Sequence, residues 1–343
     1  MSDLKRLVCV AREQLEWRSY SEPELSPGEL RVRSDYSASK HGTEMAAFKG
    51  YEQSRGKYDP SMKLFDGEAI PDFYPVSVGN MFVGHVSEKH SDVAQFKLGD
   101  VVFGHGGFSS THTVTAASCR ELPDGMSWQS AVCIDPAEFA LSAIRDAQLR
   151  VGDNVAVFGL GAIGLMVLQF ARLAGVKTVI GVEPLQRRRE IAGKIGVDEL
   201  IDPAKTDAGA EIKRITGNRG ADACIEYSGS RAGLYHAIRG VAFGGIVAAG
   251  AYPRPYDEGL DFGAEAHMNR PNLVFTRACS DPGRDHPRWD DRRIIDTCFE
   301  MFADGKISGD MIVTPIVPFD EILNEYERIP EDPNSYIKLG AKH

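Results

Sequence analysis

Residues 153–183 constrain the fold of this chain more than any other segment. The apolar run Val155–Phe158 predicts a buried parallel strand, and the glycine-rich turn Gly159-Leu-Gly-Ala-Ile-Gly164 follows it directly. Apolar residues then recur at helical spacing, and a second apolar strand over Thr178–Val182 ends at Glu183. A strand, a G-x-G-x-x-G turn, a helix, a strand and an acidic residue in this order indicate a dinucleotide-binding βαβ unit.

Each position of the turn has a physical role in that interpretation. Gly159 allows the tight turn, Gly161 lets the backbone approach a pyrophosphate, and Gly164 permits close packing of helix on strand. A helix is expected to begin directly after Gly161. The free N–H groups of its first residues, Ala162 and Ile163, and its positive dipole end would point at the pyrophosphate.

Glu183 favours NAD over NADP as the cofactor. Its carboxylate is expected to accept hydrogen bonds from the ribose hydroxyls, and its charge would repel a 2′-phosphate. Arg187-Arg188-Arg189 follows one turn later, and a guanidinium there could pair with that phosphate. The alternative is a solvated helix face, which we favour, with Arg188 as a further cofactor contact.

The segments after Glu183 continue the rhythm of strand and helix. We expect helices over 187–200, 207–216 and 232–241, and strands over 222–226, 244–252 and 272–279. This pattern predicts a doubly wound parallel sheet, whose ligands lie beyond the carboxyl ends of the strands. The residues predicted near the nicotinamide half of the cofactor are therefore Ser228, Gly229, Gly250 and Ala251.

The residues before the turn predict a separate, β-rich domain. Short alternating runs over 7–10, 29–36, 84–87 and 100–103 are expected to be strands of a β-barrel-like unit. Helical periodicity first appears over 127–149. We expect further helices over 290–305 and 318–326 and a closing strand over 335–339. The predicted division is a first domain over 1–140, a nucleotide domain over 141–281, and a return to the first domain over 282–343.

Composition excludes several classes of partner. The formal charge of −10 over 343 residues argues against nucleic acid or an anionic membrane as the main partner. No apolar run approaches the ~18 residues of a membrane-spanning helix, and the first residues lack a signal-peptide pattern. The six cysteines are scattered without a C-x-x-C pair, so neither a disulfide framework nor a cysteine-rich zinc lobe is predicted. We expect a cytoplasmic protein.

Several further motifs occur in a specific order along the chain. They are Leu30-Arg-Val-Arg, Ser39-Lys-His41-Gly-Thr43-Glu44, Gly79-Asn80-Met81, Phe96-Lys-Leu-Gly-Asp-Val-Val-Phe-Gly104 and Glu121-Leu-Pro-Asp-Gly-Met-Ser-Trp128. With the nucleotide motif, they resemble the medium-chain dehydrogenase/reductase superfamily, the group of the zinc alcohol dehydrogenases. The resemblance implies an α/β protein with a GroES-like β-barrel catalytic domain and a Rossmann nucleotide-binding domain. It also implies a homodimer or homotetramer that pairs through the last strand of the nucleotide sheet.

The chain departs from that superfamily at the zinc positions. Zinc members typically read C-G-T-D where this chain has His41-Gly-Thr43-Glu44, and G-H-E where it has Gly79-Asn80-Met81. A frequent third site, E-P, is Asp135-Pro136 here. Zinc needs three or four converging Cys, His, Asp or Glu ligands. Only His41 and Asp135 remain plausible, so no zinc is expected at either the catalytic or the structural site.

Without zinc, oxidation of a carbinol still needs a group that takes the hydroxyl proton. An imidazole in general titrates near neutral pH, so His41 suits this role as base or oxyanion donor, and the resemblance implies that Thr43 relays the proton. The alternative is that His41 only fills the vacated pocket or binds a substrate hydroxyl. Lys40 and Asp135 are alternative bases or substrate anchors.

The resemblance also assigns supporting and binding roles. Glu44 is expected to support the site, and Lys338 matches a basic position near the pyrophosphate, where it could pair with Glu44. Asn80, Met81 and His105 are candidate substrate contacts.

Together these features predict an NAD-dependent, zinc-independent dehydrogenase acting on a secondary alcohol of a sugar, cyclitol or other polyol. Three alternatives stay open. One is an NAD(P)H-dependent enone or quinone reductase, which Glu183 disfavours. Another is an enzyme that oxidises its substrate transiently and recycles bound NAD. The third is a nucleotide-binding protein that has lost catalysis.

Overall fold

The computed structural model describes residues 4–280 and 282–343, apart from the side chain of His41. The chain forms two compact units. Unit 1 comprises Met1–Val132 and Val313–His343, and unit 2 comprises Cys133–Ile312. Both boundaries differ from the sequence-based division, which placed 282–312 with the first domain. Helix α9 (Asp291–Ala303) packs on α3 (Ile134–Asp146), and this contact holds the segment in unit 2.

Unit 2 is built on the parallel sheet that the sequence predicts. Its strand order is β13-β12-β11-β14-β15-β16. The strands are β11 (Asn154–Phe158), β12 (Thr178–Val182), β13 (Glu199–Ile201), β14 (Ala221–Glu226), β15 (Val241–Ala249) and β16 (Asn272–Phe275). The chain runs outward from β11 to β13, then crosses back to β14 on the other side of β11. This reversal creates a switch point between β11 and β14, beyond whose carboxyl ends such sheets bind ligands.

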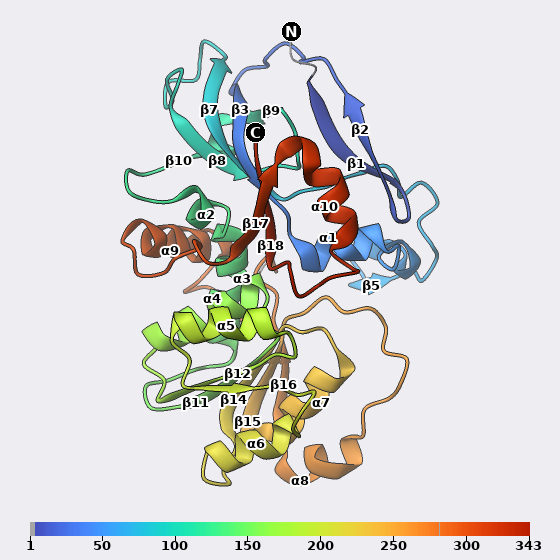
Figure 1. The fold of residues 1–343 in the computed structure, drawn as a ribbon, viewed down its shortest axis with the longest axis vertical. Helices are drawn as coiled ribbons and strands as arrows, with labels where there is room; N and C mark the ends of the chain where they lie inside the picture. The colour runs from blue at the N-terminus through green and yellow to red at the C-terminus, as the bar shows by residue number, and fades with distance from the viewer. Residues whose placement is uncertain (1–3, 281) are drawn as a thin grey trace. The chain divides into compact units, whose positions relative to one another are not determined.

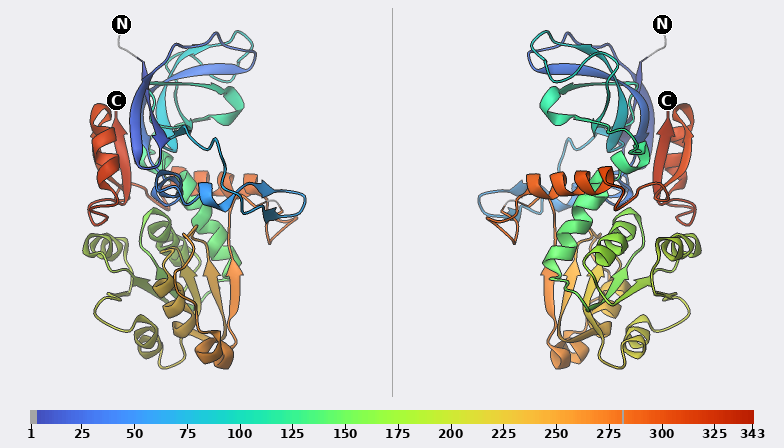
Figure 2. Two further views of the ribbon diagram at one scale, coloured as in Figure 1. Left: turned by 90° about the vertical axis from the view of Figure 1, so that its right-hand side faces the viewer. Right: turned by 90° about the vertical axis from the view of Figure 1, so that its left-hand side faces the viewer.

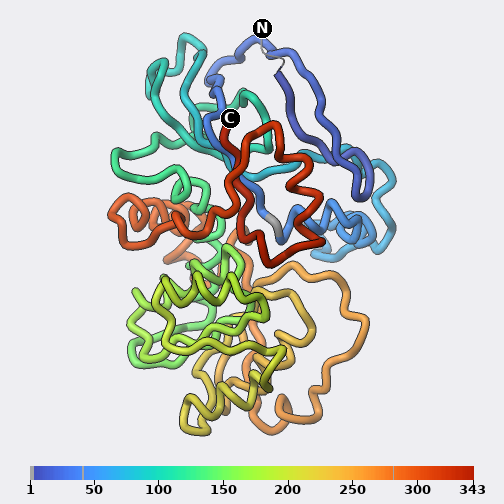
Figure 3. Tube along the Cα trace, in the orientation of Figure 1, coloured from blue at the N-terminus to red at the C-terminus, as the bar shows by residue number. Residues whose placement is uncertain are grey.

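Helices follow the strands and cover the sheet (Figure 1). They are α4 (Ala162–Leu173), α5 (Gln186–Ile195), α6 (Ala208–Ile215), α7 (Arg231–Gly240), the short η3 (Phe262–Ala266) and α8 (His267–Asn269), besides α3 and α9. Helix α3 packs on α4, and α6 packs on α7. The core between these helices and the sheet contains Phe158, Ile180, Leu234 and Val247. Figure 3 shows the irregular segment 250–261, which connects β15 to η3.

Two elements of unit 2 end earlier than predicted. The helix expected over 187–200 stops at Ile195, because Gly196 adopts a left-handed conformation with φ of 99°, which favours glycine. Residues 199–201 then form β13 beside β12. The strand expected over 272–279 ends at Phe275, where its pairing with β15 stops.

Unit 1 is β-rich, as the sequence predicts. Its larger sheet has the order β10-β8-β7-β3-β18-β17, with β9 also paired to β3, and a smaller sheet has the order β2-β1-β6. The strands are β1 (Lys5–Ala11), β2 (Gln14–Ser19), β3 (Glu29–Ala38), β6 (Val76–Ser77), β7 (Met81–Lys89), β8 (Val101–His105), β9 (Thr111–Thr115), β10 (Arg120–Glu121), β17 (Val313–Pro318) and β18 (Lys338–Lys342), with the hairpin β4 (Tyr58–Asp59) and β5 (Leu64–Phe65) apart from them.

The helical elements of unit 1 are short. They are α1 (His41–Phe48), η1 (Gln53–Arg55), η2 (Ala116–Ser118), α2 (Trp128–Ala131), η4 (Phe319–Glu321) and α10 (Ile322–Arg328). The helix expected over 127–149 is therefore two helices, α2 in unit 1 and α3 in unit 2.

The C-terminal segment is an integral part of unit 1. Strand β18 pairs antiparallel with β3, with Gly340 opposite Ala38, and Figure 2 shows this last part of the chain beside the first strands. The sequence placed the closing strand over 335–339, three residues too early. A shared core of Leu7, Phe48, Tyr326 and Leu339 joins the first and last parts of the chain.

No helix in the described ranges is both long enough and apolar enough to cross a membrane.

Candidate active site and cofactor cradle

The three glycines of the turn occupy three different environments. Gly159 has φ of 83°, and a Cβ there would lie 2.5 Å from the backbone nitrogen of Ser228. A Cβ at Gly164 would overlap the carbonyl oxygen of Gly159. At Gly161, by contrast, the nearest atom to a Cβ would be Nη1 of Arg188 at 3.8 Å. Gly159 thus forms the tight turn and Gly164 allows the close packing of the helix, as predicted. The space beside Gly161 is open, and its contact with the cofactor stays a prediction.

Glu183 ties the end of β12 to this turn. Its Oε2 accepts a hydrogen bond from the backbone N–H of Leu160 at 2.7 Å, and its Oε1 accepts one from Leu185 at 3.0 Å. The residue is only 3% exposed. A carboxylate held by two backbone donors is fixed in position, and each oxygen keeps a lone pair for a ligand hydroxyl.

The arginines after Glu183 do not form a solvated helix face, and that expectation is wrong. Nη1 of Arg188 lies 3.8 Å from Oε2 of Glu183, and the Arg188 side chain is 20% exposed. Arg189 donates to the carbonyl oxygen of Glu183 at 2.6 Å and pairs with Asp202 at 3.0 Å. Arg188 is therefore placed beside Gly161 and Glu183, where the sequence predicts the cofactor.

The structure brings the predicted nicotinamide-side residues together at the carboxyl edge of the sheet. Ser228 abuts Gly159, and a Cβ added to Gly229 would contact Cβ of Ala251 at 3.4 Å. The backbone N–H of Gly250 donates to the carbonyl oxygen of Glu226 at 2.9 Å. The loops that follow β11, β14 and β15 therefore contact one another at the carboxyl edge of the sheet, beside the switch point.

Glu226 organises this group, and sequence reasoning missed it. Its Oε1 accepts hydrogen bonds from the backbone N–H groups of Ser228 at 2.7 Å and Gly229 at 3.0 Å, and from the hydroxyl of Ser228. Burial raises the pKa of Glu226 to about 7, against the opposing effect of these donors. A carboxyl group at the end of a buried strand, two residues before a serine, is the signal that could have identified it.

Tyr227 anchors the same loop to the helix layer. Its hydroxyl donates to the carbonyl oxygen of Phe139 in α3 at 3.0 Å. A Cβ at Gly250 would overlap the Tyr227 ring, so only glycine fits at that position. Asp135 also lies on α3, as its second residue, and is 4% exposed.

In unit 1, Glu44 connects the start of α1 to two other segments. Its Oε1 accepts a hydrogen bond from the backbone N–H of Lys40, which precedes the helix. Its Oε2 accepts from the N–H of Gly79 at 3.1 Å and from the hydroxyl of Tyr326 at 2.9 Å. One carboxylate therefore holds the turn before α1, the Gly79 loop and α10 together, and its supporting role in catalysis stays a prediction.

Lys338 belongs to the same cluster. Its Nζ donates to the carbonyl oxygen of Ser39 at 2.6 Å, and the residue is 2% exposed. Desolvation raises the pKa of Glu44, and the hydrogen bonds and the positive charge of Lys338 oppose this effect. The fully buried Tyr326, which completes the cluster, was not predicted, because nothing in its local sequence marks it.

The predicted substrate residues of unit 1 lie next to this cluster. Asn80 follows Gly79, and its backbone N–H donates to the carbonyl oxygen of Ala38 at 2.8 Å. Its side-chain Nδ2 is buried without a hydrogen-bond partner among the described residues. Met81, at 2% exposure, pairs across the sheet with the exposed His105. The unsatisfied donor on Asn80 makes it the strongest of the three as a ligand contact.

The predicted catalytic residues are divided between the units. Lys40 caps α1, His41 is its first residue, and Thr43 is exposed on it. The side chain of His41 lies outside the described part of the structure. Asp135 belongs to unit 2, whereas the other three candidates belong to unit 1.

The described side chains do not form a metal-binding cluster. Within residues 4–280 and 282–343, without the His41 side chain, no group of three or more His, Cys, Asp or Glu residues is close enough to hold a metal ion. Both oxygens of Glu44 are engaged by the donors named above, and Met81 is buried in the core.

Comparisons with known proteins agree with this architecture. Residues 162–278 match the zinc-binding dehydrogenase family, a range that contains none of the predicted zinc positions. D-guloside 3-dehydrogenase of Escherichia coli (strain K12) is 39% identical, over 98% of this chain and 99% of its own length. (R,R)-butanediol dehydrogenase of Bacillus subtilis (strain 168) is 29% identical over 73% of this chain and 76% of its own.

Solved structures show the same fold. The crystal structure of 2R,3R-butanediol dehydrogenase from Bacillus subtilis superposes with a TM-score of 0.77, covering 99% of both chains at 22% identity. The two units thus correspond to a GroES-like domain and a Rossmann domain. The chain belongs to the medium-chain dehydrogenase/reductase superfamily and is a dehydrogenase of that type.

Proposed function

We propose that this enzyme oxidises a secondary alcohol of a polyhydroxylated substrate, such as a glycoside, sugar or cyclitol, with NAD and without a catalytic zinc ion. The observation that carries the proposal is the similarity to D-guloside 3-dehydrogenase, which extends over 98% of this chain at 39% identity. Similarity over the full length favours a shared reaction type, and the substituted zinc positions favour a different activation of the alcohol.

The choice of NAD rests on Glu183. Its buried carboxylate is fixed by Leu160 and Leu185, so it cannot easily move away from a 2′-phosphate. Repulsion between two anions in a site of low dielectric is strong. Arg188 opposes this preference, because its guanidinium lies 3.8 Å from Glu183. We expect the fixed charge of Glu183 to dominate and NAD to be preferred.

The protein's own part in the reaction is to position the alcohol and accept its proton. Bound NAD supplies the hydride acceptor at C4 of the nicotinamide. In the proposed mechanism His41 takes the hydroxyl proton and Thr43 passes it on, because an imidazole titrates near neutral pH. The unsatisfied Nδ2 of Asn80 is suited to donate a hydrogen bond to a substrate hydroxyl.

We further propose that the protein is a homodimer formed along β16. This strand is an edge of the sheet, and Leu273 and Phe275 are 38% and 70% exposed on it. An exposed, apolar edge strand readily pairs with a second copy. Light scattering of the purified protein tests this proposal, and a Phe275→Glu variant is expected to shift the molar mass toward that of one chain. The proposed compartment is the cytoplasm, where thiols stay reduced; Cys9, Cys119, Cys224, Cys279 and Cys298 are free thiols.

The cofactor assignment is tested by the ratio of kcat/KM with NAD to that with NADP. Wild-type protein is expected to favour NAD, and Glu183→Ser is expected to lower or reverse the ratio, because the charge repulsion is removed while Arg188 remains. Glu190→Gln on the exposed side of α5 is the matched control and should leave the ratio unchanged. A wild-type preference for NADP would contradict the proposal.

A further inference from the structure

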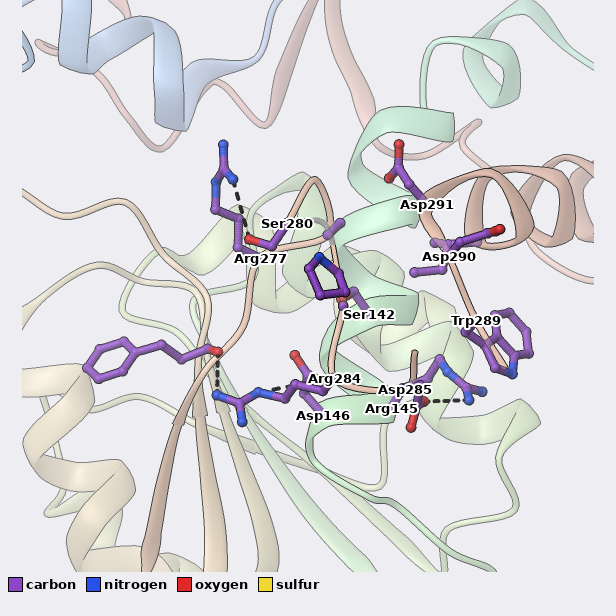
Figure 4. A pocket seen from close by; sticks show the side chains of 15 residues that line it. Ser142, Arg145, Asp146, Arg277, Ser280, Arg284, Asp285, Trp289, Asp290 and Asp291 are labelled. Carbon is purple, nitrogen blue, oxygen red and sulfur yellow. Dashed lines mark hydrogen bonds and ion pairs between the residues drawn. The ribbon is translucent and has the colours of Figure 1, made fainter. Parts of the chain in front are cut away.

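A pocket of about 400 Å³ lies in unit 2 and plays no part in the site described so far (Figure 4). It is formed by the end of α3, the segment that follows β16, and the start of α9. Its lining includes Ser142 and Arg145 of α3, Arg277 and Ser280 after β16, and Trp289 before α9. Its volume falls within the range of small-molecule sites.

The pocket lies next to the expected position of the nicotinamide. Phe275 at the end of β16 pairs with Ala249 at the end of β15, and the N–H of Thr276 donates to the carbonyl oxygen of Ala249 at 3.0 Å. Gly250 and Ala251, predicted near the nicotinamide, are the next residues after β15. A ligand in this pocket would therefore sit beside the carboxyl edge of the sheet, where such folds bind their substrates.

Most charges of the pocket are already paired with one another. Arg145 forms an ion pair with Asp285 at 2.5 Å, and Nε of Arg284 lies 3.9 Å from Asp146. Arg284 also donates to the carbonyl oxygen of Phe275 at 3.2 Å. These contacts leave fixed donors and acceptors around the pocket but little net charge: three arginines and four aspartates among its described lining residues give −1.

Trp289 provides a rigid apolar wall. The guanidinium of Arg145 lies over its ring at 3.8 Å from the centroid, and that of Arg293 at 4.2 Å. Such cation–π contacts hold the indole in place. Trp289 lies on the opposite side of the pocket from Arg277 and Ser280 (Figure 4).

Arg277 differs from the other two arginines. Among the residues that the structure describes, its guanidinium donates within its own turn, to the carbonyl oxygen of Cys279 at 3.2 Å and to Oγ of Ser280 at 3.3 Å. No carboxylate pairs with it among the described residues. The side chain is exposed, so its remaining N–H donors are available to a ligand.

We propose that this pocket binds the polyhydroxylated part of the substrate, and that Arg277 is the residue that selects for it. The ligand class is a neutral glycosyl or polyol group, because fixed and mutually paired charges suit hydroxyl groups. This inference rests on the proposed function and adds a second anchoring point for the same substrate.

The test measures binding of methyl α-D-guloside to the full-length protein saturated with NAD, together with NADH formation. Arg277→Ala is expected to raise the Kd and KM for the glycoside by about ten- to hundredfold, the range for losing a hydrogen bond from a charged donor. The Kd for NAD should stay the same. Arg292→Ala, on the 89% exposed side chain of a neighbouring arginine on α9, is the matched control and should behave like wild type. Equal melting temperatures for the variants show that the fold is kept.

The outcomes separate this inference from the proposed function. NADH formation with an unchanged KM in Arg277→Ala overturns the pocket assignment and leaves the proposed function intact. Binding that depends on Arg277 without NADH formation supports the pocket and counts against the proposed reaction. Failure of the wild-type protein to bind methyl α-D-guloside, D-glucitol and myo-inositol overturns the assignment. Tighter binding of D-guluronate than of methyl α-D-guloside would overturn the neutral ligand class.

Discussion

Two regions are each organised by one carboxylate, but over very different sequence distances. One is the cofactor cradle of unit 2, which is the turn 159–164 with Glu183, and the other is the α1 corner of unit 1, which is Glu44 with its three donors. In the cradle, the donors to Glu183 come from residues 2 and 23 positions away. In the α1 corner, the donors to Glu44 come from residues 4, 35 and 282 positions away. The contacts of the cradle are therefore local in sequence. Those of the α1 corner form only after the two ends of the chain have come together.

This difference predicts how stability and activity respond to substitutions in the two sites. A change in the cradle acts through backbone contacts within a single βαβ unit. A change in the α1 corner acts through the contact between α1 and α10, so stability and catalysis should both respond.

The largest effect is expected from Gly164→Ala, because the new Cβ would overlap the carbonyl oxygen of Gly159. Overpacking against rigid backbone should cost ~3 kcal/mol of unfolding free energy. Gly161→Ala is the matched control, since its Cβ would have no atom closer than 3.8 Å. We expect this control to fold normally and to bind NAD more weakly. Urea unfolding and NAD titration measure both quantities, and equal stability of the two variants would contradict the geometry of the turn.

The ionisation of Glu226 should make the free energy of unfolding depend on pH. Burial raises its pKa to about 7 from the usual 4.5, so between these values the folded protein holds a proton that the unfolded chain has released. Its contribution to stability is therefore lost as pH rises from about 4.5 to 7, by up to ~3 kcal/mol.

Glu226→Gln removes this ionisation while keeping an oxygen that can accept the Ser228 and Gly229 donors. Thermal unfolding at pH 5 and pH 8 should show the variant gaining stability relative to wild type at the higher pH. The exposed Glu190→Gln change should show no such trend. If the difference between Glu226→Gln and wild type is the same at both pH values, Glu226 does not titrate in this range.

The smallest effect is expected from Tyr326→Phe, which removes the hydroxyl that donates to Glu44. Loss of one hydrogen bond to a charged group should cost about 1–3 kcal/mol. Tyr336→Phe is a matched control, because Tyr336 donates to Glu325 at 2.6 Å over only 11 positions. Both variants should be less stable, but only Tyr326→Phe should lower kcat, because Glu44 holds the start of α1. An equal effect of both on kcat would show that the α1 corner has no special role.

The same difference in sequence distance decides how much could be predicted. The βαβ unit, the tight turn at Gly159, the close packing at Gly164 and the position of Glu183 follow from short-range pattern, and the structure places them as expected, while the role of Gly161 in cofactor binding stays a prediction. Glu226 was missed because the strand pattern indicates burial but not which donors will face a side chain. Tyr326 was missed because its partner is 282 positions away. The interpretation of Arg188 and Arg189 as a solvated face failed because their partners, Glu183 and Asp202, depend on how α5 packs.

Zinc-independent alcohol oxidation is best tested by NADH formation from methyl α-D-guloside with purified, metal-analysed protein. We expect NADH formation with less than stoichiometric zinc, and loss of most activity in His41→Ala. Chelator treatment should leave the wild-type rate unchanged. One tightly bound zinc per chain, whose removal abolishes turnover, would show that the reaction depends on the metal.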